Sequence, residues 1–206
     1  MTISAKCQTN TIHLSLRGNG SAFALNPLKD SCVIASPGCL SFYDLNGIGS
    51  PRQVIHYEQP LKITKLIYQF GGQVAALRGG VVSLFDPNAA MRPLKASIKS
   101  SYTMNDMDCS SSYTSLIGVC FDNGSTRIYD SRSCTHPTSN LISSTTEPML
   151  KIKWNTNIDS GHYLAASSAT CLHIWDMRMH NTCIEDISCE EGLTHCSGEV
   201  CSLVIK

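Results

Sequence analysis

The chain has 206 residues, 42% of them hydrophobic, which is enough for one folded domain or a repeat array with a continuous core. Its 16 lysines and arginines balance 16 aspartates and glutamates, so no net positive field draws it to nucleic acid or anionic lipid. The sequence has no basic and apolar leader and no apolar run of about 18 residues, which predicts a soluble chain in the cytoplasm or the nucleus.

The cysteine content is high, at 11 residues, but the number is odd and the cysteines are scattered along the chain. Several lie inside apolar runs, where a free cysteine packs as a small hydrophobic residue. Without a secretory signal, we expect these cysteines to be reduced thiols.

A four-residue pattern with aspartate at its third position recurs four times. It is found at residues 42–45, 84–87, 128–131 and 174–177. The aspartates are spaced by 42, 44 and 46 residues, which is the period of a four-stranded propeller blade. We therefore predict an all-β fold of about four blades.

Taken in chain order, the first expected element is residues 11–16, which could serve as an outer strand that closes a ring. The four units then follow at about residues 21–61, 62–104, 105–147 and 148–190, after an N-terminal segment of residues 1–20. Residues 191–206 resemble the opening of a fifth unit.

Within the units, short β-branched and aromatic runs separated by glycine and asparagine predict strands linked by hairpins. In the second unit we expect strands at residues 63–68, 73–77 and 81–85, and in the fourth unit at 149–154, 163–167 and 171–175. No amphipathic helix of useful length is expected.

The fourth unit ends its third strand with Ile174-Trp175-Asp176, a sequence that resembles the WD-repeat family. The resemblance covers about residues 21–206 and implies a β-propeller that acts as a non-catalytic protein scaffold. The family's Gly-His pair is missing ahead of all four units, so packing must hold these blades together. Four units plus one strand are at or below the usual range of four to eight blades, which suggests a truncated chain, a divergent short form or a piece of a larger propeller.

Arg132 and Arg178 each follow the repeated aspartate by two residues, in consecutive units. This resembles the WDxR signature of propellers that are substrate receptors of cullin-RING ubiquitin ligases, in which the arginine would contact a partner. The alternative is a solvated arginine at the start of a turn.

A narrower resemblance, over residues 124–132, 148–155 and 163–165, is to the proteins related to the plant regulator TRANSPARENT TESTA GLABRA. It implies a scaffold for transcription factors and kinases, with a link to ubiquitin-ligase adaptors through the animal members. A second candidate is a structural subunit of a nutrient-sensing or coat-type complex.

Further partner-binding residues are expected in the loops at one end of the blades. Those between second and third strands are Pro37, Arg78, Asp122 and Ser168, and those ahead of first strands are Gln59 and Glu147.

No enzyme motif, cofactor site or metal site is expected. The C-terminal set Cys183, Cys189, His195, Cys196 and Cys201 contains no Cys-x-x-Cys pair and is better explained as buried thiols with one structural histidine than as zinc ligands. Asp106 and Asp108 are interpreted as solvated or turn-capping residues. Lys151 and Lys153 are interpreted as lying on the solvent-exposed face of a strand. The expected partners are other proteins, with no nucleic acid, membrane span or small-molecule substrate.

Overall fold

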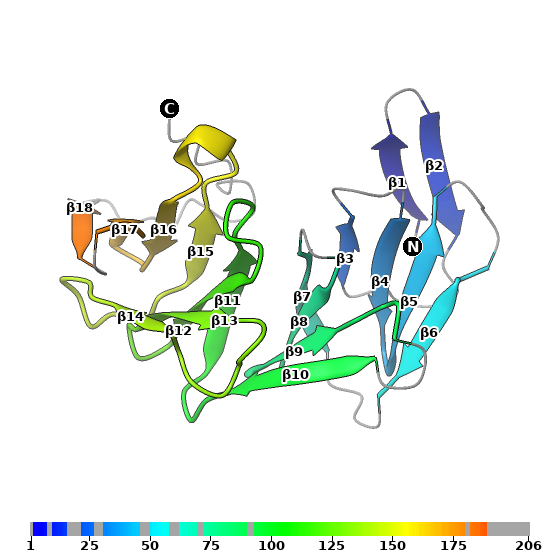
Figure 1. The fold of residues 1–206 in the computed structure, drawn as a ribbon, viewed down its shortest axis with the longest axis horizontal. Coiled ribbons are helices and arrows are strands. Elements are labelled where there is room, and N and C mark those ends of the chain that lie inside the picture. Colours follow the sequence, from blue (N-terminus) through cyan, green and yellow to red (C-terminus); the bar gives the residue numbers. More distant parts are fainter. Residues whose placement is uncertain are drawn as a thin grey trace.

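A computed structural model describes residues 2–7, 10–15, 22–26, 31–45, 50–57, 62–69, 72–89, 93–179 and 182–188. These residues form one two-stranded hairpin and four four-stranded antiparallel sheets (Figure 1). The helical content of the described ranges is one 3-10 turn, η1 (Ile158–Ser160), and none of their helices has the length and apolarity to cross a bilayer. The prediction of an all-β fold built from four repeated units is confirmed.

Each sheet is a meander of four consecutive strands. The first sheet contains β3 (Ala22–Leu25), β4 (Ser31–Ser36), β5 (Cys39–Asp44) and β6 (Gln53–His56). The second contains β7 (Ile63–Tyr68), β8 (Val74–Arg78), β9 (Val81–Phe85) and β10 (Leu94–Lys99). The third contains β11 (Met104–Cys109), β12 (Leu116–Phe121), β13 (Thr126–Asp130) and β14 (Ser139–Leu141). The fourth contains β15 (Lys151–Trp154), β16 (Tyr163–Ser167), β17 (Cys171–Asp176) and β18 (Cys183–Ser188).

The repeated four-residue pattern occupies the same place in every sheet, at the end of the third strand. The expected strands at residues 63–68, 81–85 and 163–167 agree with β7, β9 and β16. The strand expected to begin at residue 149 begins at Lys151 instead. The backbone N–H of Met149 bonds to the carbonyl of Phe121 in the third sheet, so this residue is outside the β15–β16 ladder.

The core lies between consecutive sheets, because side chains alternate between the two faces of each strand. On β8, Val74 and Ala76 pack toward the first sheet, whereas Ala75 and Leu77 pack toward the third. A further cluster joins the third and fourth sheets around Trp154 and Trp175. The sheets therefore follow one another along an arc, from the blue first sheet on the right of Figure 1 to the orange end of the fourth on the left.

Asp106 and Asp108 on β11 are buried, so their interpretation as solvated or turn-capping residues is wrong. Asp106 accepts a hydrogen bond from the backbone N–H of Ile152 at 3.2 Å and lies 2.7 Å from Lys65 Nζ. The two aspartates share one face of a strand, and the first strand of the next sheet lies against that face. Their carboxylates therefore bond the third sheet to the fourth.

The hairpin of β1 (Thr2–Cys7) and β2 (Asn10–Ser15) is a separate sheet (Figure 1). The strand expected to close a ring, at residues 11–16, thus pairs with β1 and does not extend any of the four-stranded sheets. The first strands of consecutive sheets pack closely on one another, as β3 does on β7 and β11 on β15. In the described part of the chain no comparable packing joins the first sheet to the fourth, and residues 191–206 lie outside that part.

Candidate functional site

The residues proposed to bind partners lie at opposite ends of the sheets. Since successive strands are antiparallel, turns between second and third strands lie at one end, and turns between third and fourth strands lie at the other. Arg78 and Asp122 belong to the first end, together with Glu147 in the loop between β14 and β15. Arg132 and Arg178 belong to the second end, so these residues cannot form one contiguous site.

Arg132 is held by the aspartate two residues before it. Its backbone N–H and its Nε both donate to Asp130 Oδ1 at 2.9 Å, and its Nη2 donates to Oδ2 at 2.5 Å. This forked bond is the pairing that a planar guanidinium makes best with a carboxylate. It keeps the pKa of Asp130 at about 2, below its usual value.

Arg178 repeats this geometry on the fourth sheet. Its backbone N–H donates to Asp176 Oδ1 at 2.9 Å, and its Nη2 donates to Oδ2 at 2.6 Å. The hydrogen bonds from Arg178 lower the pKa of Asp176 to about 2, and His162 Nε2 lies 3.8 Å from the same carboxylate.

In both pairs the aspartate is shielded and the arginine faces solvent. The side chains of Arg132 and Arg178 are 75% and 58% exposed, whereas those of Asp130 and Asp176 are 15% and 4% exposed. The corresponding position of the second unit is Asn88, whose backbone N–H bonds to Asp86 Oδ1 without a guanidinium. Among the described residues, the forked pair is therefore found in the third and fourth units.

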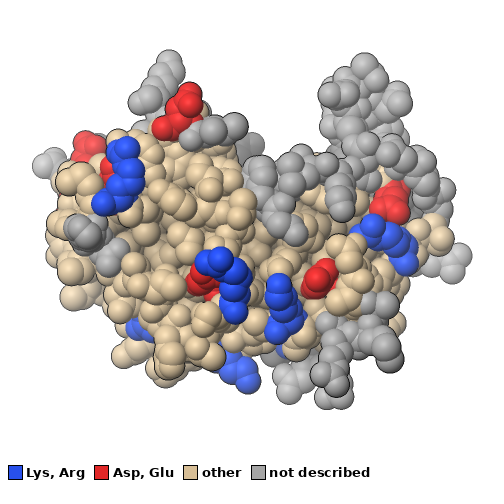
Figure 2. All heavy atoms as spheres, in the orientation of Figure 1, with Lys and Arg blue, Asp and Glu red and all other residues tan. Residues whose placement is uncertain are grey.

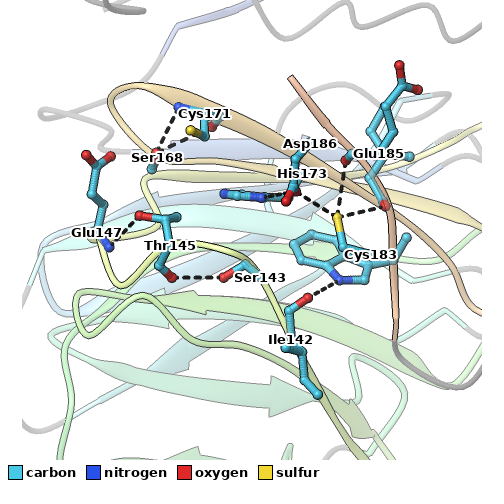
Figure 3. A network of polar contacts seen from close by, with 12 residues as sticks. Ile142, Ser143, Thr145, Glu147, Ser168, Cys171, His173, Cys183, Glu185 and Asp186 are labelled. Atoms are coloured by element: carbon cyan, nitrogen blue, oxygen red, sulfur yellow. Dashed lines mark hydrogen bonds and ion pairs between the residues drawn. The ribbon is translucent and has the colours of Figure 1, made fainter. Parts of the chain in front are cut away.

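The other end of the third and fourth sheets brings several predicted residues together. Glu147 accepts a hydrogen bond from the Thr170 hydroxyl at 2.7 Å, and bonds from Thr170 and Ser168 lower the pKa of Glu147. The backbone N–H of Glu147 donates to the Thr145 hydroxyl oxygen at 3.0 Å (Figure 3). The turn that follows Asp122 packs on the same loop, because a Cβ on Gly124 would lie 2.9 Å from the Glu147 carbonyl oxygen. Asp122 Oδ1 accepts from the Thr103 backbone N–H at 3.1 Å, so its carboxylate also has a local partner.

Arg78 lies apart from this group, between the first and second sheets. Its guanidinium carbon lies 4.9 Å from the centre of the Tyr57 ring, in cation–π contact. The cavity beside it has a volume of about 10 Å³, room for at most one water molecule. Pro37 is exposed in its turn, Ser168 is buried, and Gln59 lies outside the described residues.

A compact cluster of three side chains that could hold a metal was not anticipated from the sequence. His173 of β17 and Cys183 and Asp186 of β18 place their ligand atoms within 4.8 Å of one another. Figure 3 shows both β18 residues turned toward the imidazole. Of the cysteine and histidine set weighed as zinc ligands, Cys183 is described, whereas Cys189, His195, Cys196 and Cys201 lie outside the described residues.

The cluster is not arranged as a thiolate nucleophile with a histidine base. Asp186 Oδ1 lies between the other two groups, 2.5 Å from His173 Nδ1 and 2.9 Å from Cys183 Sγ. Burial raises the pKa of the Cys183 thiol to about 11, and hydrogen bonds from Cys183 and Ser144 keep the pKa of Asp186 at about 2. At neutral pH the thiol is protonated and donates to an ionised carboxylate, which makes it a poor nucleophile.

On the face drawn in Figure 2, the basic residues (blue) and the acidic residues (red) form small, scattered patches, often with both colours side by side. Most of that surface is tan, the colour of the uncharged residues. A nucleic-acid groove would present a continuous basic stripe with interleaved aromatic residues.

Comparison with known proteins gives no assignment, because the chain matches no protein-family model and no curated protein at a significant level.

Proposed function

We propose that this chain is a non-catalytic scaffold of the WD-repeat propeller class that binds other proteins through the exposed ends of its sheets. Four sheets packed in series form a rigid support for short turns, and turns on a rigid support are common binding surfaces.

The observation that carries the proposal is the repeated pair of Asp130 with Arg132 and Asp176 with Arg178. A free arginine side chain loses rotamer entropy when it is ordered by a partner. These two arginines are already held by their aspartates, so that loss is reduced. Nε and Nη2 make the bonds to the aspartate, and the largely exposed guanidinium keeps further N–H groups for carbonyl or carboxylate acceptors on a partner.

The same observation favours one more specific alternative, a substrate receptor of a cullin-RING ubiquitin ligase. The repeated Asp-x-Arg pairs at the same end of consecutive sheets support it. In that case the partner at this end is a ubiquitin-ligase adaptor, and the opposite end, with Asp122, Arg78 and Glu147, is available for a substrate.

The experiment is quantitative affinity capture from cell lysate with the full chain and three variants. The first variant is Arg132→Ala with Arg178→Ala, and the second is Arg132→Lys with Arg178→Lys, which keeps the charge but removes the planar fork. The control is Arg52→Ala, because Arg52 also pairs with an aspartate, Asp44 at 3.4 Å, but outside the Asp-x-Arg pattern.

A scaffold that binds through these arginines loses the same group of proteins in both double variants and keeps it in Arg52→Ala. For the ligase alternative, that group contains a ubiquitin-ligase adaptor, and binding to the purified adaptor falls in parallel. Capture of the same proteins in equal amounts by the wild type and both double variants contradicts the role of the two arginines.

A further inference from the structure

We propose that His173, Cys183 and Asp186 form a binding site for one divalent transition-metal ion of the zinc type, on the β17–β18 hairpin. The site is independent of the proposed scaffold function. A β-bulge, the positions of three ligand atoms and the charge of the cluster together support such a site.

The β-bulge determines which side chains share a face. In a regular strand Cys183 and Asp186, three residues apart, would point to opposite faces. In the β17–β18 ladder Ile174 pairs with Glu185 but Trp175 pairs with Cys183, so β18 carries one extra residue. The extra residue returns Cys183 to the face of Asp186, which itself pairs directly with His173.

The three ligand atoms are already close to a metal geometry. His173 Nδ1 and Cys183 Sγ lie 2.5 Å and 2.9 Å from Asp186 Oδ1. Zinc bonds of about 2.0–2.3 Å in tetrahedral geometry need ligand atoms roughly 3.5 Å apart, so the carboxylate must move by about 1 Å. The Asp186 side chain is 35% exposed and can make this movement by rotation.

The charge of the cluster suits a dication. With a thiolate, a carboxylate and a neutral imidazole, the ligands carry two negative charges, which one divalent ion neutralises. In the described part of the chain, Asp186 contacts the His173 imidazole, and no lysine or arginine forms an ion pair with this carboxylate. Imidazole and thiolate together select zinc-type ions over magnesium or calcium, which prefer oxygen ligands.

Binding requires two protons to move. The Cys183 thiol releases its proton to solvent, and the proton on His173 Nδ1 passes to Nε2, so the imidazole stays neutral. Nε2 is buried and has no hydrogen-bonding partner among the described residues, so the change breaks no existing hydrogen bond at that atom. Three protein ligands leave one coordination position, and the exposure of Asp186 allows water to fill it.

The test is titration of the purified, metal-stripped full chain with Co²⁺, a spectroscopic substitute for Zn²⁺. We expect one equivalent to bind, with a thiolate-to-cobalt charge-transfer band that added Zn²⁺ abolishes. Cys183→Ser should remove the band. Asp186→Asn should weaken metal binding by at least about tenfold, because even changes to residues that only hydrogen-bond to a metal ligand weaken binding by that factor. Cys171→Ser is the matched control, because Cys171 is a half-buried thiol on β17 outside the cluster.

Circular dichroism and thermal melting of each variant without metal show whether it is folded. If Cys183→Ser misfolds, Asp186→Asn still tests the site, because Asp186 is exposed and its replacement should leave the fold intact. The proposal is overturned if the folded wild type gives no thiolate band. It is equally overturned if folded Cys183→Ser keeps the band, because the thiolate ligand would then be another cysteine.

Discussion

Asp108 on β11 accepts a hydrogen bond from the backbone N–H of Trp154 on β15 at 2.8 Å, across 46 residues of sequence and between two sheets. Lys153 Nζ lies 3.1 Å from the same carboxylate oxygen. Asp106 makes the parallel contact with Ile152, so two buried carboxylates bond to alternate backbone N–H groups of one strand. The third and fourth sheets are thus joined by directional polar bonds as well as by apolar packing.

Replacing Asp108 with alanine should lower the free energy of unfolding by roughly 1–3 kcal/mol, because the buried N–H of Trp154 loses its acceptor. Asp108→Asn keeps an acceptor oxygen and should cost less. Urea unfolding followed by tryptophan fluorescence measures both, with the exposed Asp159→Ala as the control. Equal stability of Asp108→Ala and Asp159→Ala would contradict a structural role for the inter-sheet bond.

Gly124→Ala should be more destabilising than Gly38→Ala, although both glycines have a φ near +80°. The backbone cost of a left-handed alanine, roughly 1–2 kcal/mol, applies to each. Gly38 has no atom within 4 Å of an added Cβ, whereas at Gly124 that Cβ would lie 2.8 Å from the Thr146 carbonyl carbon. Forcing this backbone contact should add roughly 1–3 kcal/mol, as overpacking does. Comparable unfolding midpoints in urea for the two variants would show that the β14–β15 loop moves aside freely.

The forked Asp-Arg pairs should make stability depend on pH between about 4 and 2. The folded-state pKa values of Asp130 and Asp176 are about 2, below the usual 3.8. Their contribution is therefore present above pH 4 and is lost as the pH falls toward 2. Removing both guanidinium groups, with Arg132→Ala and Arg178→Ala, should lower stability at pH 7 and flatten the decline between pH 4 and 2.

Urea unfolding at a series of pH values measures that slope, and Arg52→Ala, which keeps both pairs, should retain the wild-type slope. An unchanged slope in the double variant would mean that other groups keep the aspartate pKa values low.

Buried thiols should resist alkylation until the chain unfolds. Burial raises the pKa of Cys120 to about 12 and that of Cys32 to about 11, so little reactive thiolate exists at pH 8 and access is blocked. Cys39, half-buried beside the turn at Gly38, should react with iodoacetamide before the buried Cys32 and Cys120. Peptide mapping by mass spectrometry gives the order, and modification of Cys120 as fast as Cys39 in the folded chain would indicate opening between the third and fourth sheets.

Much of the fold could be predicted because its signals are local. The spacing of Asp44, Asp86, Asp130 and Asp176 indicated four units, and these residues lie at or just after the end of the third strand in each sheet. Side-chain alternation and turn glycines identified the ends of the expected strands to within one residue, except at Met149, which bonds to a neighbouring sheet and leaves β15 to begin two residues later. Ring closure depends on how distant units meet, and a period along the chain carries no information about it.

The candidate sites could be predicted only in part. Arg132 and Arg178 were visible as a repeated spacing, but their forked bonds to the preceding aspartates are a matter of side-chain geometry. The cluster of His173, Cys183 and Asp186 gave no recognisable spacing, since the ligands lie on two strands and a bulge changes their alternation.

The sequence by itself determined the number of repeats, which segments are β-strands and where the turns lie. Backbone propensity and the alternation of side chains act over a few neighbouring residues, so a local pattern is enough to predict them. The tertiary structure alone decided that Asp106 and Asp108 are buried bonding groups and that His173 meets Cys183 and Asp186. These outcomes depend on which strand lies against which, and on one extra residue in a ladder. Both are properties of chain segments meeting in space, so the local pattern around each residue does not contain them.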